Sequence, residues 1–120
     1  MTEEKDFCEP YKILIEALLD KHAKEVTVHD LSELSGFAET FIVAVSRSEL
    51  HSRTLKDTAE EALDRLGLPY RIEGENSSKW TLIDVGHLIV NILSREGRDF
   101  YRLDSLWGDA PTKRFVDQDD

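Results

Sequence analysis

The stretch Thr40–Val45, TFIVAV, is the feature that most limits how this chain can fold. It is a short, uninterrupted run of apolar residues rich in β-branched side chains, which is typical of a strand buried on both of its faces. A strand of this kind needs helices packed against its sheet. The run therefore predicts an α/β fold with this segment as a central strand.

Two amphipathic helices are expected to cover the sheet. The first lies within residues 10–23, where Pro10 is tolerated in the first turn and apolar residues recur at helical spacing. The second lies within residues 46–67, where Ser46 and Glu49 could form a capping box and Gly67 marks the end. Its expected buried stripe consists of Leu55, Ala59, Ala62, Leu63 and Leu66.

Four more strands are expected from alternation and from turn residues. One covers residues 25–31, and three follow the second helix, at residues 70–73, 79–84 and 88–93. A last helix is expected at residues 97–107. The predicted fold is a single α/β domain, residues 1–107, with a mixed five-stranded sheet flanked by helices in the order α-β-β-α-β-β-β-α. Residues 108–120 are expected to form a flexible acidic tail.

The composition limits the cellular setting and the partners. The beginning of the chain, MTEEKDFCEP, is acidic and lacks an apolar run, so neither a secretory signal nor a transit peptide is indicated. The longest apolar runs are far shorter than the roughly 20 residues that cross a bilayer. The single cysteine cannot form an internal disulfide. We expect a cytoplasmic protein without a membrane partner.

The net charge of −10, from 25 acidic and 15 basic residues, counts against direct binding to nucleic acid. Such binding needs clustered cations to neutralise phosphates, and the basic residues of this chain do not gather into a block. A basic protein partner is one interpretation of the acidity. The other is that the charge merely keeps the domain in solution.

The sequence offers little for catalysis or for metal binding. The four histidines lie on separate expected elements without metal-ligand spacing, so no metal and no cofactor are expected. Cys8 lies in an acidic stretch that would not activate a thiol. Asp30 and Asp84 occur singly, and Asp84, just before Val85 and Gly86, is most simply a turn residue that binds its own backbone. No catalytic residue is predicted.

Aromatic residues give the clearest indication of a binding surface. Trp80 alternates with Leu82 and Asp84, so one face of that strand would be part apolar and part charged. In the last helix, Tyr101 falls beside Arg98 and opposite the apolar arc, where an interface residue would lie. The apolar arc contains Trp107, which fits either core or contact, with Phe100, Leu103 and Leu106.

The segments EGENSSKW, LIDVGHLIVNIL and FYRLDSLW give the chain a resemblance to the ribosomal silencing factor family, also called RsfS or Iojap-like. The resemblance runs from about residue 30 to 107. It implies a nucleotidyltransferase-like fold without the metal-binding acids of those enzymes. Residues that depart from the family pattern are Glu39, Ser46, His87, Asn91 and Asp104, where an Asp, a Gly, an acid, a His and a Glu are usual.

The resemblance also implies a function. A factor of this family would bind the large ribosomal subunit through its fourteenth ribosomal protein and block joining of the small subunit when nutrients are limiting. The expected anchors are Trp80, Arg98 and Tyr101. Further partner-binding residues are Glu73, Asp84 and Asp104, as an acidic rim, and Trp107.

Two other functions are kept as alternatives. One is a nucleotidyltransferase-like enzyme that would use Asp30 or Asp84, favoured only by fold analogy. The other is a homodimeric scaffold acting through an exposed sheet edge. The free silencing factor could also be a dimer.

Overall fold

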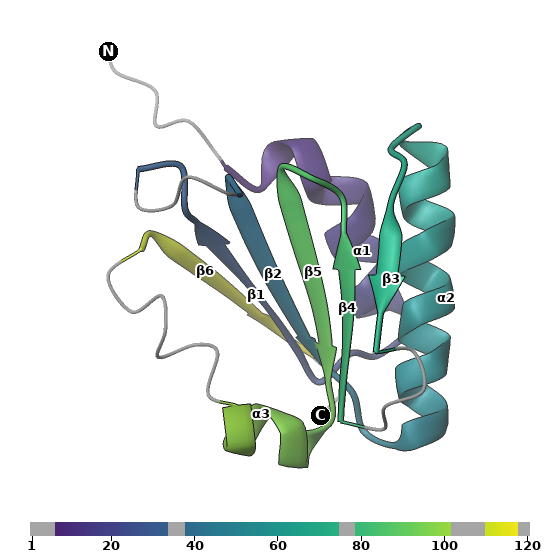
Figure 1. Cartoon of the computed structure of the whole chain (residues 1–120). Helices are drawn as coiled ribbons and strands as arrows, with labels where there is room; N and C mark the ends of the chain where they lie inside the picture. The colour runs from purple at the N-terminus through teal and green to yellow at the C-terminus, as the bar shows by residue number, and fades with distance from the viewer. Residues whose placement is uncertain (1–6, 34–37, 75–78, 102–109, 118–120) are drawn as a thin grey trace.

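The computed structural model describes residues 7–33, 38–74, 79–101 and 110–117. Within these ranges one sheet has the strand order β3-β4-β5-β2-β1-β6, with α1 and α2 packed on one of its faces (Figure 1). The elements are η1 (Glu9–Tyr11), α1 (Lys12–Asp20), β1 (Glu25–Asp30), β2 (Thr40–Val45), α2 (Glu49–Arg65), β3 (Arg71–Glu73), β4 (Trp80–Asp84), β5 (Leu88–Leu93), α3 (Arg95–Tyr101) and β6 (Thr112–Val116).

Strand β2 is the central strand that its composition predicts. All six of its residues are buried. Ile42 and Ala44 point into the core that α1 and α2 cover, whereas Phe41 and Val43 belong to a second apolar cluster on the other face. β2 pairs antiparallel with β1 and parallel with β5, so the predicted mixed sheet is confirmed.

The start of α2 differs from the predicted capping box. The side chain of Ser48, not Ser46, caps the helix by accepting a hydrogen bond from the backbone N–H of His51 at 3.0 Å. Ser46 still belongs to the sheet, because its N–H donates to the carbonyl of Leu93 at 2.8 Å. The backbone pairing of the sheet therefore continues one residue past the apolar run, and the helix begins only at Glu49. Four residues of the predicted stripe are buried, Leu55, Ala59, Ala62 and Leu63.

A sixth strand corrects the predicted five-stranded sheet. β6 pairs antiparallel with β1 at the edge of the sheet. The expectation of a flexible tail is therefore wrong for residues 112–116. Most residues of this strand are polar, so the sequence pattern does not predict a strand. Phe115 packs against the core, and the carbonyl of Pro111 accepts a hydrogen bond from the N–H of Asp30 at 2.8 Å. β6 is thus held by its pairing with β1 and by one partly buried apolar anchor, Phe115.

Helix α3 follows β5 and lies at one end of the sheet (Figure 1). It begins two residues before the expected helix, at Arg95, and residues 102–107 of that expected helix lie outside the described part of the chain. Its first turn is held by the Ser94 side chain, which accepts a hydrogen bond from the N–H of Gly97 at 2.9 Å. Among the described helices, none combines the length and the apolar character that a membrane span requires.

Candidate protein-docking face

The sheet face opposite α1 and α2 brings together three of the predicted partner-binding residues, and we call it the docking face. Strand pairing sets Trp80 opposite Leu93 and Asp84 opposite Ile89, and Glu73 in β3 lies beside Leu82 in β4. Because side chains alternate along a strand, Trp80, Leu82 and Asp84 point to the same face. The predicted part apolar and part charged strand surface is therefore present.

Trp80 is held in place by a buried amide. Its indole Nε1 donates a hydrogen bond to Oδ1 of Asn91 at 2.8 Å, and Nδ2 of Asn91 donates to the carbonyl of Ile42 at 3.2 Å. Asn91 is fully buried, whereas Trp80 is half-buried and packs against the second apolar cluster. One edge of the indole is thus fixed while the rest of the ring stays partly accessible.

Replacing Asn91 with leucine tests this support. Leucine has a similar volume but cannot accept from the indole or donate to the Ile42 carbonyl, so two polar groups would lose their partner. We expect the free energy of unfolding to fall by about 1–3 kcal/mol in urea denaturation. Asn91→His, which keeps an acceptor for the indole N–H, is the comparison variant and should lose less. Equal losses in the two variants would argue against the hydrogen bond as the source of the stabilisation.

The two acidic residues at this end of the sheet differ in their roles. Glu73 is exposed. Asp84 is half-buried, and its Oδ1 accepts a hydrogen bond from the N–H of Gly86 at 2.8 Å, so the predicted turn role is confirmed. One oxygen of Asp84 shapes the β4–β5 turn, which limits how far the side chain can move toward a partner.

Arg98 reaches the same face from α3. Its Nη1 contacts Oε1 of Glu25, and the other carboxylate oxygen of Glu25 lies 2.5 Å from Nε of Arg114 in β6. The Glu25 side chain is only 4% exposed, whereas that of Arg98 is 35% exposed. Arg98 is thus tied to the sheet and still presents part of its surface to solvent.

Trp80 and the Arg98 contact lie on one row that crosses the docking face. Pairing sets Trp80 opposite Leu93, Leu93 opposite Val45, and Val45 opposite Glu25. The row spans three strand spacings, about 14 Å. The residues between them, Leu93 and Val45, are buried, so the accessible groups lie at the two ends of the row, where Trp80 is half-buried and the Arg98 side chain is 35% exposed.

Three of the predicted residues cannot be added to this picture. Asp104 and Trp107 lie outside the described residues. Tyr101 is the last described residue of α3, and its side chain is also outside the described part. Sequence reasoning also missed two residues, Asn91 and Glu25. Asn91 could have been found, because an amide inside the apolar run LIVNIL needs a buried partner. Glu25 carries no such signal, since its partners are distant in sequence.

The acids of the enzyme alternative are not brought together. Asp30 and Asp84 lie on β1 and β4, three strand spacings apart in the sheet, or about 14 Å. The Oδ1 of Asp30 accepts a hydrogen bond from the N–H of Ser32 at 3.1 Å, which is again a turn role. Among the described residues, no group of three or more His, Cys, Asp or Glu side chains could hold a metal ion.

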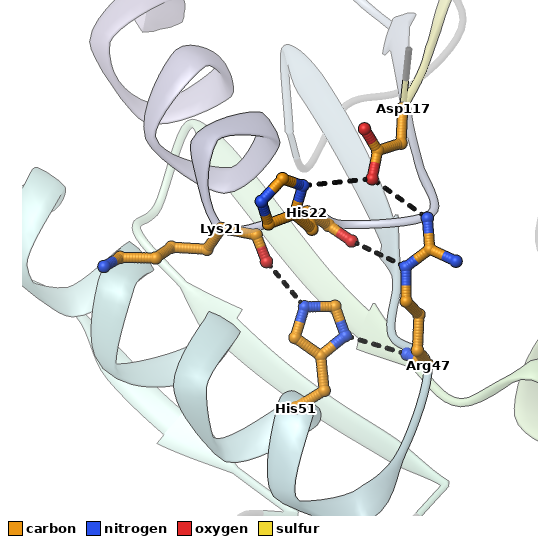
Figure 2. Close-up of polar contacts among 5 residues, drawn as sticks. All are labelled: Lys21, His22, Arg47, His51 and Asp117. Carbon is orange, nitrogen blue, oxygen red and sulfur yellow. Dashed lines mark hydrogen bonds and ion pairs between the residues drawn. The ribbon is translucent and has the colours of Figure 1, made fainter. Parts of the chain in front are cut away.

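Two histidines belong to a polar network that joins three parts of the chain (Figure 2). His51 accepts a hydrogen bond at Nδ1 from the N–H of Arg47 at 2.8 Å and donates from Nε2 to the carbonyl of Lys21 at 2.7 Å. The carboxylate of Asp117 lies 2.9 Å from Nη2 of Arg47 and 3.3 Å from Nδ1 of His22. The network links the end of α1, the start of α2 and the residue after β6.

Within the described ranges of the chain, the shifted pKa values do not mark a general base. Burial raises the pKa of the Tyr11 phenol above its ordinary value of 10.0. The hydrogen bond from Lys56 to Glu60 raises the pKa of that lysine. Both groups therefore stay protonated at neutral pH, whereas a general base must be free to accept a proton.

The sequence matches known proteins over most of its length. A family model described as "Ribosomal silencing factor during starvation" matches residues 4–120. A Halalkalibacterium halodurans protein named Ribosomal silencing factor RsfS is 30% identical over 102 residues, which is 84% of this chain and 87% of that protein. A protein of the same name from Treponema pallidum is 35% identical over 102 residues, with coverages of 82% and 90%.

The fold matches solved structures from bacteria. A crystal structure of a Chromobacterium violaceum protein has a TM-score of 0.79 and 30% identity, covering 87% of this chain and 88% of that one. A second crystal structure, from Bacillus halodurans, has a TM-score of 0.74 and 25% identity, with coverages of 88% and 96%. The arrangement of strands and helices described above is therefore one that related sequences adopt.

Proposed function

Because this chain belongs to the ribosomal silencing factor family, we propose that it represses translation by binding the large ribosomal subunit and blocking the joining of the small subunit. The contact is with the fourteenth protein of the large subunit, and repression operates in the cytoplasm when nutrients are limiting. The observation that supports this proposal best is the docking face, where a Trp80 ring held by Asn91 lies on the same row as the Arg98 ion pair.

The chemistry of the docking face suits a protein partner. Tryptophan and arginine are the residue types most often found as anchors at interfaces, and anchors bind well when their conformation is fixed beforehand. An interface of roughly 800 Å² on each partner is enough for a specific contact. Glu73 lies beside Leu82 and Asp84 ends β4, both on the face that carries Trp80, where acidic side chains can meet a basic ribosomal protein.

Inhibition needs no bond to be made or broken. A factor that occupies a surface required by the small subunit excludes that subunit, so the extent of repression follows from mass action. The net charge of −10 also favours encounter with a basic protein over encounter with the phosphates of ribosomal RNA. Affinity for the large subunit then determines how strongly the factor represses.

Gradient sedimentation of purified subunits is the experiment that tests the proposal. Wild-type protein at rising concentration should travel with the large subunit and lower the fraction of joined ribosomes. Addition after joining is the useful comparison, because a factor that works by occlusion should act on free subunits more than on joined ones. A protein that stays at the top of the gradient at micromolar concentration, with joining unchanged, would remove the proposed activity.

Tyr101→Ala tests the third predicted anchor. If this tyrosine contacts the ribosomal protein, its removal should weaken binding to the large subunit about 30-fold, or about 2 kcal/mol. The affinity can be measured by microscale thermophoresis with labelled subunits. Asp99→Ala changes an exposed residue of the same helix and serves as control. Unchanged affinity in a folded Tyr101→Ala variant would exclude the tyrosine from the interface.

A further inference from the structure

A buried carboxylate joins three elements around the docking face. Glu25 begins β1 and lies on the docking face, opposite Val45 on one side and Val116 on the other. Its side chain is 4% exposed and pairs with Arg98 from α3 and with Arg114 from β6. The two arginines follow Glu25 by 73 and 89 residues, so these two contacts join parts of the chain that are far apart in the sequence.

The two arginines are unequal partners. Arg114 is 60% exposed and belongs to a strand that is already hydrogen-bonded to β1 along its length. Arg98 is 35% exposed and belongs to α3, which is described from Arg95 to Tyr101 and lies at one end of the sheet (Figure 1). Most of the stability of a helix in a protein comes from its tertiary packing, so α3 depends on such contacts. Loss of Glu25 should therefore affect α3 more than β6.

Because the Glu25 carboxylate is buried, it needs charged partners at its oxygens. A carboxylate removed from water is strongly unfavourable unless charged partners and hydrogen bonds replace the solvent. Oε2 of Glu25 accepts a hydrogen bond from Arg114, whereas the buried Oε1 has no hydrogen bond among the described residues and relies on the charge of Arg98 alone. Any position of α3 that moves Arg98 away would leave a buried oxygen without its cation. The ion pair thus selects one placement of the helix.

We propose that Glu25 is a positioning residue of the docking face, which holds the guanidinium of Arg98, and with it α3, in the arrangement that the partner binds. This inference rests on the proposed function, since it assigns Glu25 a role in the same protein contact. Glu25 itself is buried and does not meet the partner. Its contribution to affinity passes through Arg98.

Glu25→Gln is the first variant, because glutamine keeps the shape of the side chain and removes its charge. Affinity for the large subunit should fall about tenfold, less than when one member of a buried charge pair at the interface itself is truncated, because Glu25 acts through Arg98. Glu61→Gln is the matched control, with the same change of net charge at a 71% exposed position on α2. The control should bind as wild type.

A double-variant cycle with Arg98→Met separates positioning from general destabilisation. If Glu25 acts through Arg98, the Glu25→Gln change should alter affinity less than about twofold once Arg98 is methionine. Additive losses would overturn the proposal, because Glu25 would then act by another route. Wild-type affinity in the Glu25→Gln single variant would overturn it as well.

Amide hydrogen exchange gives a readout that does not involve the ribosome. The N–H of Arg98 donates to the carbonyl of Ser94 at 2.9 Å, so it reports on α3 directly. Glu25→Gln should speed exchange in the α3 peptide about tenfold while α2 exchanges as in wild type. Unchanged exchange in α3 would overturn the positioning role. If Glu25→Gln does not fold, Arg98→Lys tests the pair from the other side, with the same expected and contrary results.

The two readouts keep the two proposals apart. If wild-type protein binds no large subunit, the proposed function fails, and the exchange measurement still decides whether Glu25 fixes α3. If wild-type protein binds and Glu25→Gln changes neither affinity nor exchange, the function stands and the positioning role fails.

Discussion

Gly97→Ala is expected to destabilise the protein by about 2–4 kcal/mol, although alanine is the better helix former. A Cβ at Gly97 would lie under 3.0 Å from the backbone carbonyl oxygen of Lys79, closer than real Cβ atoms come to such a group. Helix propensity alone would give a gain of about 1 kcal/mol. The clash is with backbone and cannot be relieved by a side-chain rotation, so overpacking should outweigh that gain.

The same residue connects α3 to the edge of the docking face. Lys79 precedes Trp80, and its carbonyl also accepts a hydrogen bond from the N–H of Ser94 at 3.1 Å. A shift that makes room for the new methyl group must move α3 away from β4 or push the start of β4 outward. We therefore expect the α3 peptide to exchange faster in this variant even under conditions where the rest of the protein stays folded.

Thermal and urea unfolding of Gly97→Ala and Glu96→Ala make the comparison direct. Glu96 is exposed and lies in the same helix, so its replacement changes helix propensity without the clash. Only the Gly97 variant should lose several kcal/mol of the free energy of unfolding. A Gly97→Ala protein as stable as wild type would mean that α3 can lie farther from β4 than the structure shows.

The buried strands were the most predictable part of the fold. Every residue of the run TFIVAV is buried on β2, and all of them except Thr40 are apolar. A run of this composition fits no other element of the fold. The LIVNIL strand was predicted with its observed bounds, Leu88–Leu93. Both signals are strong because a strand buried on two faces tolerates few polar residues.

Elements that lie at the boundary of the core were less predictable. β6 has one core-packing aromatic residue among polar neighbours, which is also the composition of a loop. The α2 start was misplaced because Ser46 and Ser48 are both possible caps, and only the pairing of Ser46 with Leu93 decides between them. In both cases the decisive interaction is a backbone hydrogen bond to a distant strand.

The candidate site shows the same division. The shared face of Trp80, Leu82 and Asp84 follows from alternation along one strand and needs no knowledge of the rest of the fold. The Arg98–Glu25 pair could not be predicted, because 73 residues separate the partners and either charge alone resembles an exposed one. The family resemblance predicted Arg98 as an anchor, and the structure pairs its guanidinium with Glu25.

Trp80→Ala is expected to weaken binding to the large subunit about 100-fold, the largest effect we predict for a single anchor. Removal of the indole takes away a large apolar contact surface at the start of β4 and leaves Oδ1 of Asn91 without its hydrogen-bond donor. The second effect also lowers stability by about 1–3 kcal/mol. Affinity must therefore be measured at a temperature where the variant is fully folded by circular dichroism.

Two further variants separate these contributions. Trp80→Phe keeps an aromatic ring but loses the N–H, so it should share the stability loss and retain more of the affinity than alanine. Ile13→Ala truncates a 47% exposed apolar residue on α1, which covers the opposite face, and should bind as wild type. If folded Trp80→Ala binds as wild type while Ile13→Ala does not, the partner lies on the helical side. The row from Trp80 to Glu25 would then serve the fold alone.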